Sequence, residues 1–355
     1  MTVIGFHASH EQVHPTALLE AVQAAEQAGF TAAMCSDHFF PWSERQGESA
    51  FSYAWLGAAL QATSLPFGMV TAPGQRYHPA IVAQAFATLS AMFPGRFWAA
   101  LGSGQNLNEH ITGDAWPRKE VRQARLRECV DVIRRLLTGE LVNHTGLVTV
   151  NDARLFTLPA PELQPALLGA AVTPATAEWV ASWADGLITI NQPHDVLRQI
   201  VEKYRGAGGR GPLHLQLHLS YAADEDEAAA VAYDQWRTNV SAPPVPWDLP
   251  TQAHFDAVAQ LVTPDAVRGP VQISADPAEH AARIAEFTDL GFDQIYLHHV
   301  GQEQLRWIEV FGERVLPQLD VTAPQPPLAL PVGSVERVED PGPAPDAHAE
   351  AEVTA

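Results

Sequence analysis

The sequence is poor in cysteine, in basic residues and in long apolar runs. Its two cysteines, Cys35 and Cys129, lie far apart in apolar stretches, so we expect buried thiols in a reduced, cytoplasmic protein. Lys and Arg number 21 against 41 Asp and Glu, a net charge of -20, which argues against nucleic acid as a partner because a phosphate backbone needs clustered cations. The apolar runs fall short of the roughly 20 residues of a membrane span. Met1 precedes a short strand pattern rather than a signal peptide.

Two catalytic patterns are also missing. No close group of His, Cys, Asp and Glu has the spacing of a zinc site, so we expect no metal. The G-x-S-x-G elbow of common esterases does not occur either. A metal-dependent barrel hydrolase is therefore the least favoured of the functions that we considered.

What the sequence does contain is a regular alternation of apolar strand patterns and helical patterns, repeated eight times. The expected strands lie at 2–8, 30–36, 65–72, 96–104, 165–171, 185–190, 213–221 and 292–300. Nearly continuous apolar strands are typical of parallel sheets covered on both faces. The pattern predicts an α/β fold, a (β/α)8 TIM-type barrel, with a doubly wound open sheet as the alternative.

The domain boundaries follow from the same pattern. We expect one barrel over residues 1–320, with insertions at about 140–164 and 240–275. The last segment, 321–355, holds seven of the 28 prolines and no aromatic residue, and it is predicted to be a disordered tail.

Polar residues gather where the expected strands end. All strands of a parallel barrel finish at one rim, which is where the active sites of such barrels lie. Six segments are therefore predicted to form one pocket: 36–42 (SDHFFPW), 71–78, 102–109 (GSGQNLNE), 169–174, 188–193 and 297–301.

The first of these segments offers the best candidates for chemistry. Asp37 and His38 are adjacent, so on extended backbone their side chains point to opposite sides and cannot form a dyad. We place His38 in the pocket, because its titration near neutral pH suits proton handling. Trp42 either caps the barrel or offers its flat face to a ring system.

The loop at 102–109 suits the approach of a cofactor. Its glycines at 102 and 104 allow backbone to come close to a ligand, although the pattern lacks the spacing of a dinucleotide fingerprint. Gln105, Asn106 and Asn108 carry amides that can bind the edge of a heterocycle. Alternatively, Asn106, Asn108 and Glu109 belong to the cap of the next segment.

Taken together, SDHFFPW, QRYHPAIVAQAFATLSAMFPGRFWAALGSG, LNE…TGDAWP and DGLITI resemble the luciferase-like flavin and deazaflavin oxidoreductases, nearest the branch of F420-dependent glucose-6-phosphate dehydrogenases. The likeness covers about residues 3–318 and is most specific in the first 140. It implies a metal-free barrel, usually dimeric, that holds a flavin-type cofactor at the carboxyl rim and transfers a hydride at the central ring.

The resemblance also assigns roles to individual residues. It implies that His38 and Trp42 stabilise the reacting substrate and that Asp37 touches the cofactor ring. The family's bulged third strand, which often carries a non-prolyl cis peptide, falls on about Val70, Thr71 and Ala72. The remaining implied cofactor contacts are Ser103, Gly104, Gln105 and Asn108 in one loop and Ala171, Val172 and Thr173, which correspond to the family's phosphate cradle.

Two departures from the family pattern bear on the substrate. The glutamate that serves the sugar-phosphate dehydrogenases as proton donor is Gln105 here, an amide, so Glu109 or His38 would have to take that role. The lysine expected after DGLITI is absent. We therefore do not expect glucose 6-phosphate to be the substrate.

These departures lead to the expected function. We expect a luciferase-like oxidoreductase that carries out hydride transfer or monooxygenation on a small organic molecule, with FMN preferred over coenzyme F420. The alternatives are an F420-dependent dehydrogenase or reductase and a catalytically silent flavin-binding relative. A homodimer and a separate flavin reductase are the expected partners.

Overall fold

The structure, a computed structural model, describes residues 2–322 and contains a closed parallel barrel. Eight strands pair in the order β1-β2-β3-β4-β7-β8-β9-β11, and β11 pairs with β1 to close the ring. They are β1 (Val3–Ala8), β2 (Ala32–Ser36), β3 (Phe67–Thr71), β4 (Phe97–Leu101), β7 (Leu167–Ala170), β8 (Leu187–Ile190), β9 (Leu213–Ser220) and β11 (Gln294–His299). The predicted TIM-type barrel is confirmed, and the open-sheet alternative is wrong.

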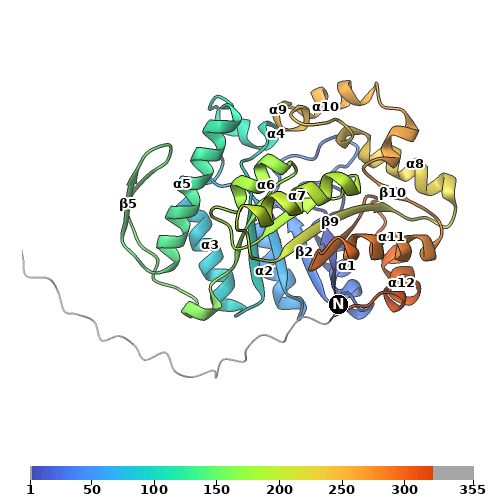
Figure 1. Cartoon of the computed structure of the whole chain (residues 1–355), viewed down its shortest axis with the longest axis horizontal. Coiled ribbons are helices and arrows are strands. Elements are labelled where there is room, and N and C mark those ends of the chain that lie inside the picture. Colours follow the sequence, from blue (N-terminus) through green and yellow to red (C-terminus); the bar gives the residue numbers. More distant parts are fainter. Residues whose placement is uncertain (1, 323–355) are drawn as a thin grey trace, which may run out of the picture.

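Helices follow the strands and cover the outside of the barrel (Figure 1). The helices of the described residues, including those at the end of the barrel, are α1 (Pro15–Gln27), α2 (Ser52–Ala62), α3 (Pro79–Met92), α4 (Asn106–Glu109), α5 (Lys119–Leu137), α6 (Pro174–Val180), α7 (His194–Gly206), α8 (Glu225–Trp236), α9 (Val245–Asp248), α10 (Gln252–Ala259), α11 (Pro277–Asp289) and α12 (Leu305–Arg314). Proline begins α1, α3, α6 and α11, where its missing N–H costs no hydrogen bond. None of the described helices combines the length and hydropathy needed to cross a membrane.

The strands differ in what they turn towards the barrel interior. Strands β2 and β4 are buried along their whole length, as expected for a sheet covered on both faces. Strand β9 alternates: its leucines pack with the outer core, while His214, Gln216 and His218 contact interior side chains. The sequence predicts β9 as one more apolar strand, and its polar interior face is found only in the structure.

Large rings fill part of the barrel interior. Trp98 and Tyr296 lie 5.7 Å apart between ring centroids and belong to one buried cluster with Met34 and Leu168. A Cβ on Gly68 would lie 1.9 Å from the Trp98 ring. A glycine at this position of β3 is therefore what leaves room for the indole.

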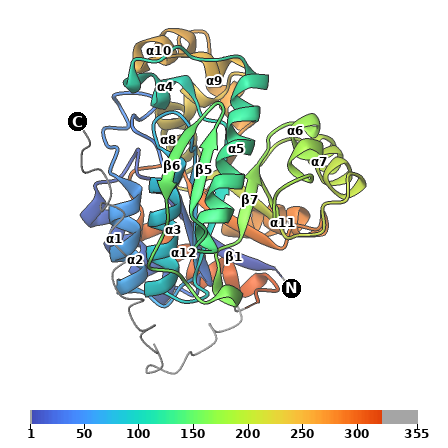
Figure 2. The same ribbon diagram turned by 90° about the vertical axis from the view of Figure 1, so that its left-hand side faces the viewer.

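The two expected insertions contain elements of their own. Strands β5 (Val142–Thr145) and β6 (Thr149–Ala153) form an antiparallel hairpin beside α5. Helices α9 and α10 lie with α4 at one end of the barrel (Figure 2). A short strand that the sequence analysis did not predict, β10 (Gln272–Ile273), pairs with the end of β9.

The chain returns to its beginning at the end of the described region. Thr2 forms a β-bridge with Val321, and the N–H of Thr322 donates to the Thr2 carbonyl at 3.1 Å. The rest of the predicted tail, residues 323–355, lies outside the described residues.

Candidate active site

The segment that follows β2 places Asp37 and His38 on opposite sides, as extended backbone requires. Asp37 is buried, and its Oδ2 accepts hydrogen bonds from the Thr71 hydroxyl and the Arg76 guanidinium, each at 3.0 Å. The Tyr77 hydroxyl donates to Oδ1 at 3.3 Å. Asp37 is thus held by the end of β3 and the loop after it, and it does not pair with His38.

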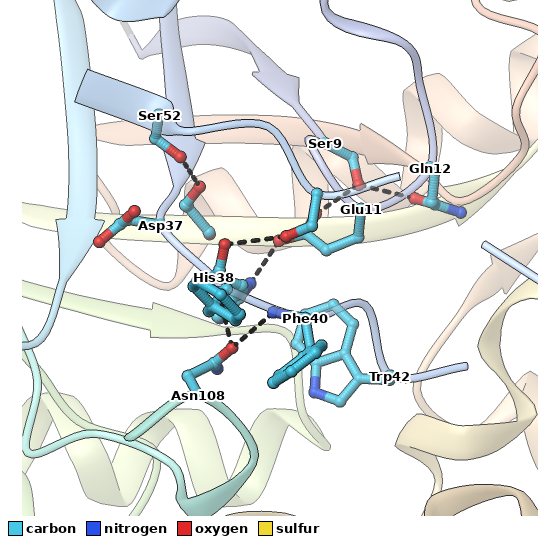
Figure 3. Close-up of polar contacts among 12 residues, drawn as sticks. Ser9, Glu11, Gln12, Asp37, His38, Phe40, Trp42, Ser52 and Asn108 are labelled. Atoms are coloured by element: carbon cyan, nitrogen blue, oxygen red, sulfur yellow. Dashed lines mark hydrogen bonds and ion pairs between the residues drawn. The ribbon is translucent and has the colours of Figure 1, made fainter. Parts of the chain in front are cut away.

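His38 faces the loop that follows β1, where Nδ1 contacts the carboxylate of Glu11 (Figure 3). Glu11 is fully buried, and its other oxygen accepts a hydrogen bond from the Ser9 hydroxyl at 2.8 Å. Burial alone would raise the pKa of Glu11, but the charge and hydrogen bond of His38 hold it below its usual range. The carboxylate therefore fixes the imidazole with a proton on Nδ1.

This arrangement leaves one imidazole nitrogen free for chemistry. Nε2 of His38 has no hydrogen-bond partner among the described residues, and 17% of the side chain is exposed. An imidazole held by a buried carboxylate through Nδ1 can accept a proton at Nε2, and the carboxylate stabilises the resulting cation. Glu11 is not among the residues predicted from the sequence, where its only signal is a carboxylate just past the end of the first strand.

Trp42 lies beside His38 and under the helices of the second insertion. Its ring meets His38 edge to face at 4.6 Å and Trp236 of α8 at 5.7 Å between centroids. The indole Nε1 is buried and has no partner within residues 2–322. Trp42 also belongs to an apolar cluster with Leu107 and Phe255. It caps the barrel, and its buried indole N–H is a donor without a partner close to His38.

Asn108 ties the rim loops after β2 and β4 together. Its Oδ1 accepts hydrogen bonds from the backbone N–H groups of Phe39 (2.8 Å) and Phe40 (3.1 Å), as Figure 3 shows. Its Nδ2 donates to Oε1 of Gln105 at 3.2 Å. In this structure Asn108 therefore positions the loop that carries His38.

Glu109 lies in a different part of the site from His38. Its Oε2 accepts from the backbone N–H of Arg76 at 2.8 Å, and Oε1 lies 3.7 Å from the Arg76 guanidinium. Burial raises the pKa of Glu109, and the charge of Arg76 opposes that shift. None of the hydrogen bonds of Glu109 in the described structure reaches His38 or Trp42.

The third strand departs from what the resemblance implied. Residues 67–71 pair in continuous register with β2 and β4, so no bulge interrupts the strand at Val70 or Thr71. Within residues 2–322 the cis peptide bond is Pro243–Pro244, and the bonds at Val70, Thr71 and Ala72 are trans. The implied bulge and cis peptide are therefore absent here.

Two loops at the rim offer unused backbone donors. The N–H groups of Ser103 and Gly104, and those of Val172 and Thr173, donate to no other described residue. Ala171 uses its N–H to continue the sheet, donating to Ile188 at 3.0 Å. These donors suit an anionic group such as a phosphate.

A buried polar network below the rim was also not predicted. His7 stacks on His298 at 4.2 Å, and His298 bonds through its two nitrogens to Gln12 and Gln216, each at 3.0 Å. Burial lowers the pKa of His7 to about 3 and that of His298 well below its usual value. Within residues 2–322 no group of three or more His, Cys, Asp or Glu side chains is placed to hold a metal ion.

Comparison with known proteins decides the family. Residues 1–294 match the luciferase-like monooxygenase family. The chain belongs to this family. The match covers all the strands from β1 to β10, and it confirms the resemblance drawn from the motifs.

Individual relatives of this luciferase-like chain are similar over nearly its whole length. It is 34% identical over 330 residues to the F420-dependent glucose-6-phosphate dehydrogenase of Nakamurella multipartita, covering 89% of this chain and 96% of the relative. It is 33% identical over 325 residues to the F420-dependent hydroxymycolic acid dehydrogenase of Mycobacterium tuberculosis, covering 89% and 88%. A solved F420-dependent secondary alcohol dehydrogenase, in complex with an F420-acetone adduct, superposes with a TM-score of 0.82 at 31% identity, covering 90% and 99%.

These relatives bear on the expected cofactor. The chain is an oxidoreductase of the luciferase-like class, and its relatives favour coenzyme F420. The preference for FMN is not supported, and F420, the alternative drawn from the sequence, is the better supported choice. Monooxygenation, the homodimer, the separate reductase, the cytoplasmic location and the roles of individual site residues stay predictions.

Proposed function

We propose that this chain is an F420-dependent dehydrogenase that oxidises a neutral secondary alcohol to a ketone. The observation that carries the proposal is the His38–Glu11 pair beside Trp42, which provides a proton acceptor next to an apolar surface. Relatives named as F420-dependent dehydrogenases support the choice of cofactor.

The residues present fit a phosphate-bearing, flat cofactor. The four unused N–H groups of Ser103, Gly104, Val172 and Thr173 would hold the phosphate or neighbouring polar atoms. Gly104 has a φ of +86°, a conformation that favours glycine and that turns backbone towards a ligand. The indole N–H of Trp42 has no partner among the described residues, but it is buried, so it would donate to the substrate only after the Trp42 side chain turns towards the rim.

The chemistry divides between the cofactor and the chain. When bound, the deazaflavin supplies a ring carbon that accepts a hydride from the carbinol carbon. The hydroxyl proton passes to Nε2 of His38 as the C=O bond forms, and the substrate leaves as a ketone. The Glu11 carboxylate stabilises the charged imidazole throughout. Gln105 can orient the substrate oxygen through its amide N–H groups, but it does not ionise near neutral pH and so cannot act as a proton donor or acceptor in the reaction.

The surroundings of His38 favour a substrate without a phosphate. Trp42, Trp236 and Phe255 form an apolar cluster, and Arg45, the basic residue nearest to Trp42 in the sequence, is paired with Asp256 at 2.8 Å. The rim after β8 carries Asn191, whose side chain bonds to the Pro270 carbonyl and the His218 N–H. With no lysine there, a sugar phosphate would lack a partner for its charge.

An anaerobic assay tests this proposal. The protein is mixed with oxidised F420 and, in parallel, with FMN, and each is offered a series of secondary alcohols and glucose 6-phosphate. We expect the visible band of F420 to bleach with an apolar secondary alcohol and not with the sugar phosphate. Faster reduction with glucose 6-phosphate, or reduction of FMN in place of F420, would contradict the proposal.

Variants separate the proposed roles in the same assay. We expect His38→Gln and Glu11→Gln to lower kcat about a hundredfold, the usual scale of general acid–base catalysis, while the affinity for F420 measured by titration stays the same. Lys203→Gln removes an exposed charge paired with Glu178 on the outer helices and serves as control. Unchanged kcat in both site variants would exclude His38 as the proton acceptor.

A further inference from the structure

A basic cleft lies beside the two loops to which the cofactor is assigned. It has a volume of about 390 Å³ and lies between the start of α5 and α9. Its charged lining residues are Arg118, Lys119 and Arg122 on the basic side and Glu120 and Asp248 on the acidic side, and Trp116 and Trp247 add aromatic rings. Three cations in one cleft stand out in a chain with a net charge of -20 and only two lysines.

Arg122 is the most unusual member of this cleft. Its side chain is only 5% exposed and stacks over the Trp116 ring at 4.3 Å. Of its five N–H donors, one bonds to the Pro117 carbonyl at 2.7 Å, and its Nε is buried without a partner among the described residues. Asp248 lies 3.6 Å away and is half exposed. The guanidinium therefore has unused capacity for a further anion.

The cleft is continuous with both assigned cofactor loops. A Cβ on Gly104 would lie 3.4 Å from the Trp116 ring, so the loop after β4 packs against one wall. On the other side, Lys119 Nζ donates to the Thr176 hydroxyl at 3.1 Å, which lies 2.9 Å from the Thr173 hydroxyl. An anion bound by these two loops would therefore lie next to the cleft.

We propose that this cleft binds the acidic tail of coenzyme F420, which continues beyond the phosphate as a chain of glutamates. FMN ends at its phosphate and would leave the cleft empty. The inference rests on the proposed function and extends it. An anionic substrate is a less suitable occupant, because the contacts described for Arg122, Trp116 and Asp248 do not include His38 or Trp42, where the proton acceptor lies.

Binding of cofactors with different tails tests the inference without any turnover. The apoprotein is titrated by calorimetry with F420 that carries no glutamate and with F420 that carries several, at low and high salt. For the wild type we expect about tenfold tighter binding of the long-tailed form, equivalent to about 1.4 kcal/mol, and a smaller difference at high salt because ions screen exposed charges.

Three variants make the result specific to the cleft. Arg122→Gln, and Lys119→Gln on its more exposed side, should each reduce the advantage of the long tail severalfold while leaving the tail-less form unchanged. Arg127→Gln removes the same charge from α5 outside the cleft, where Arg127 pairs with Asp131 at 3.4 Å, and should keep the full advantage.

The outcomes also separate this inference from the proposed function. Equal affinity for both forms, or an advantage that survives in both cleft variants, would overturn the tail site while leaving the F420 dependence intact. Absence of binding by either form would overturn the F420 dependence and the tail site together.

Discussion

Acidification should destabilise the protein through His214, a histidine buried inside the barrel. It extends from β9 between Trp98 and Tyr296, at 4.6 and 5.9 Å between centroids, and neither ring nitrogen has a partner among the described residues. Burial, the sole cause of the shift, lowers its pKa from 6.5 to about 3. His214 is therefore neutral in the folded protein at any pH of practical use.

The direction and size of the effect follow from this pKa. Because the folded-state pKa is lower than the unfolded-state value, the unfolded chain binds the proton first as the pH falls. Stability is unaffected well above pH 6.5 and is lost progressively between pH 6.5 and about pH 3. At about pH 5.5 the contribution of this one residue amounts to about 1.4 kcal/mol of unfolding free energy.

Urea unfolding followed by tryptophan fluorescence, at about pH 7.5 and about pH 5.5, measures the contribution of His214 to the unfolding free energy. When the pH is lowered, we expect His214→Leu and His214→Gln to lose about 1.4 kcal/mol less unfolding free energy than the wild type. At the higher pH, His214→Leu should be the more stable variant, because it buries no unpaired polar group. The reasoning is wrong if the wild type and both variants lose the same stability between the two pH values.

Three further substitutions test the fold and the loops. Gly68→Ala should lower the unfolding free energy by about 1–3 kcal/mol, since the new methyl group meets Trp98 in the barrel; normal stability in urea would contradict the packing. Asn108→Ala should lower the unfolding free energy by about 1–3 kcal/mol and raise KM, because two N–H groups of the loop after β2 lose their acceptor. An unchanged KM would argue against this positioning role. Arg76→Met should lower the unfolding free energy by about 3–5 kcal/mol, because it leaves Asp37 buried without its cation. An unchanged melting temperature would show that the Arg76–Asp37 pair contributes nothing to stability.

The barrel could be predicted because its signal is local and repeated. Each strand–helix unit shows its own periodicity, and eight units close in one way. Features without a local pattern were missed. Strand β10 has two residues, too few to show any periodicity. The polar interior face of β9 could not be predicted, because leucine at every second position makes the strand look apolar although His214 and His218 lie between the leucines.

The candidate site was predictable only in its position along the chain. His38 and Asp37 follow a buried strand, which is enough to place them at the rim. Their partners come from elsewhere: Glu11 lies 27 residues before His38, and Arg76 lies 39 residues after Asp37. Such long-range pairs leave no trace in periodicity, so they had to come from the three-dimensional structure.

The opposite orientations of Asp37 and His38 fix the length of the chain at this point. Inserting or deleting one residue after Ser36 would turn each side chain to the other side of the backbone. An insertion would bring the Asp37 carboxylate to the side of Glu11, and a deletion of Asp37 would bring the His38 imidazole to the side of Arg76. Either change would break both pairs, with Glu11 and with Arg76. New substrates can therefore be accommodated by exchanging side chains at the rim, whereas the loop after β2 can lengthen only beyond His38 if both pairs are to be kept.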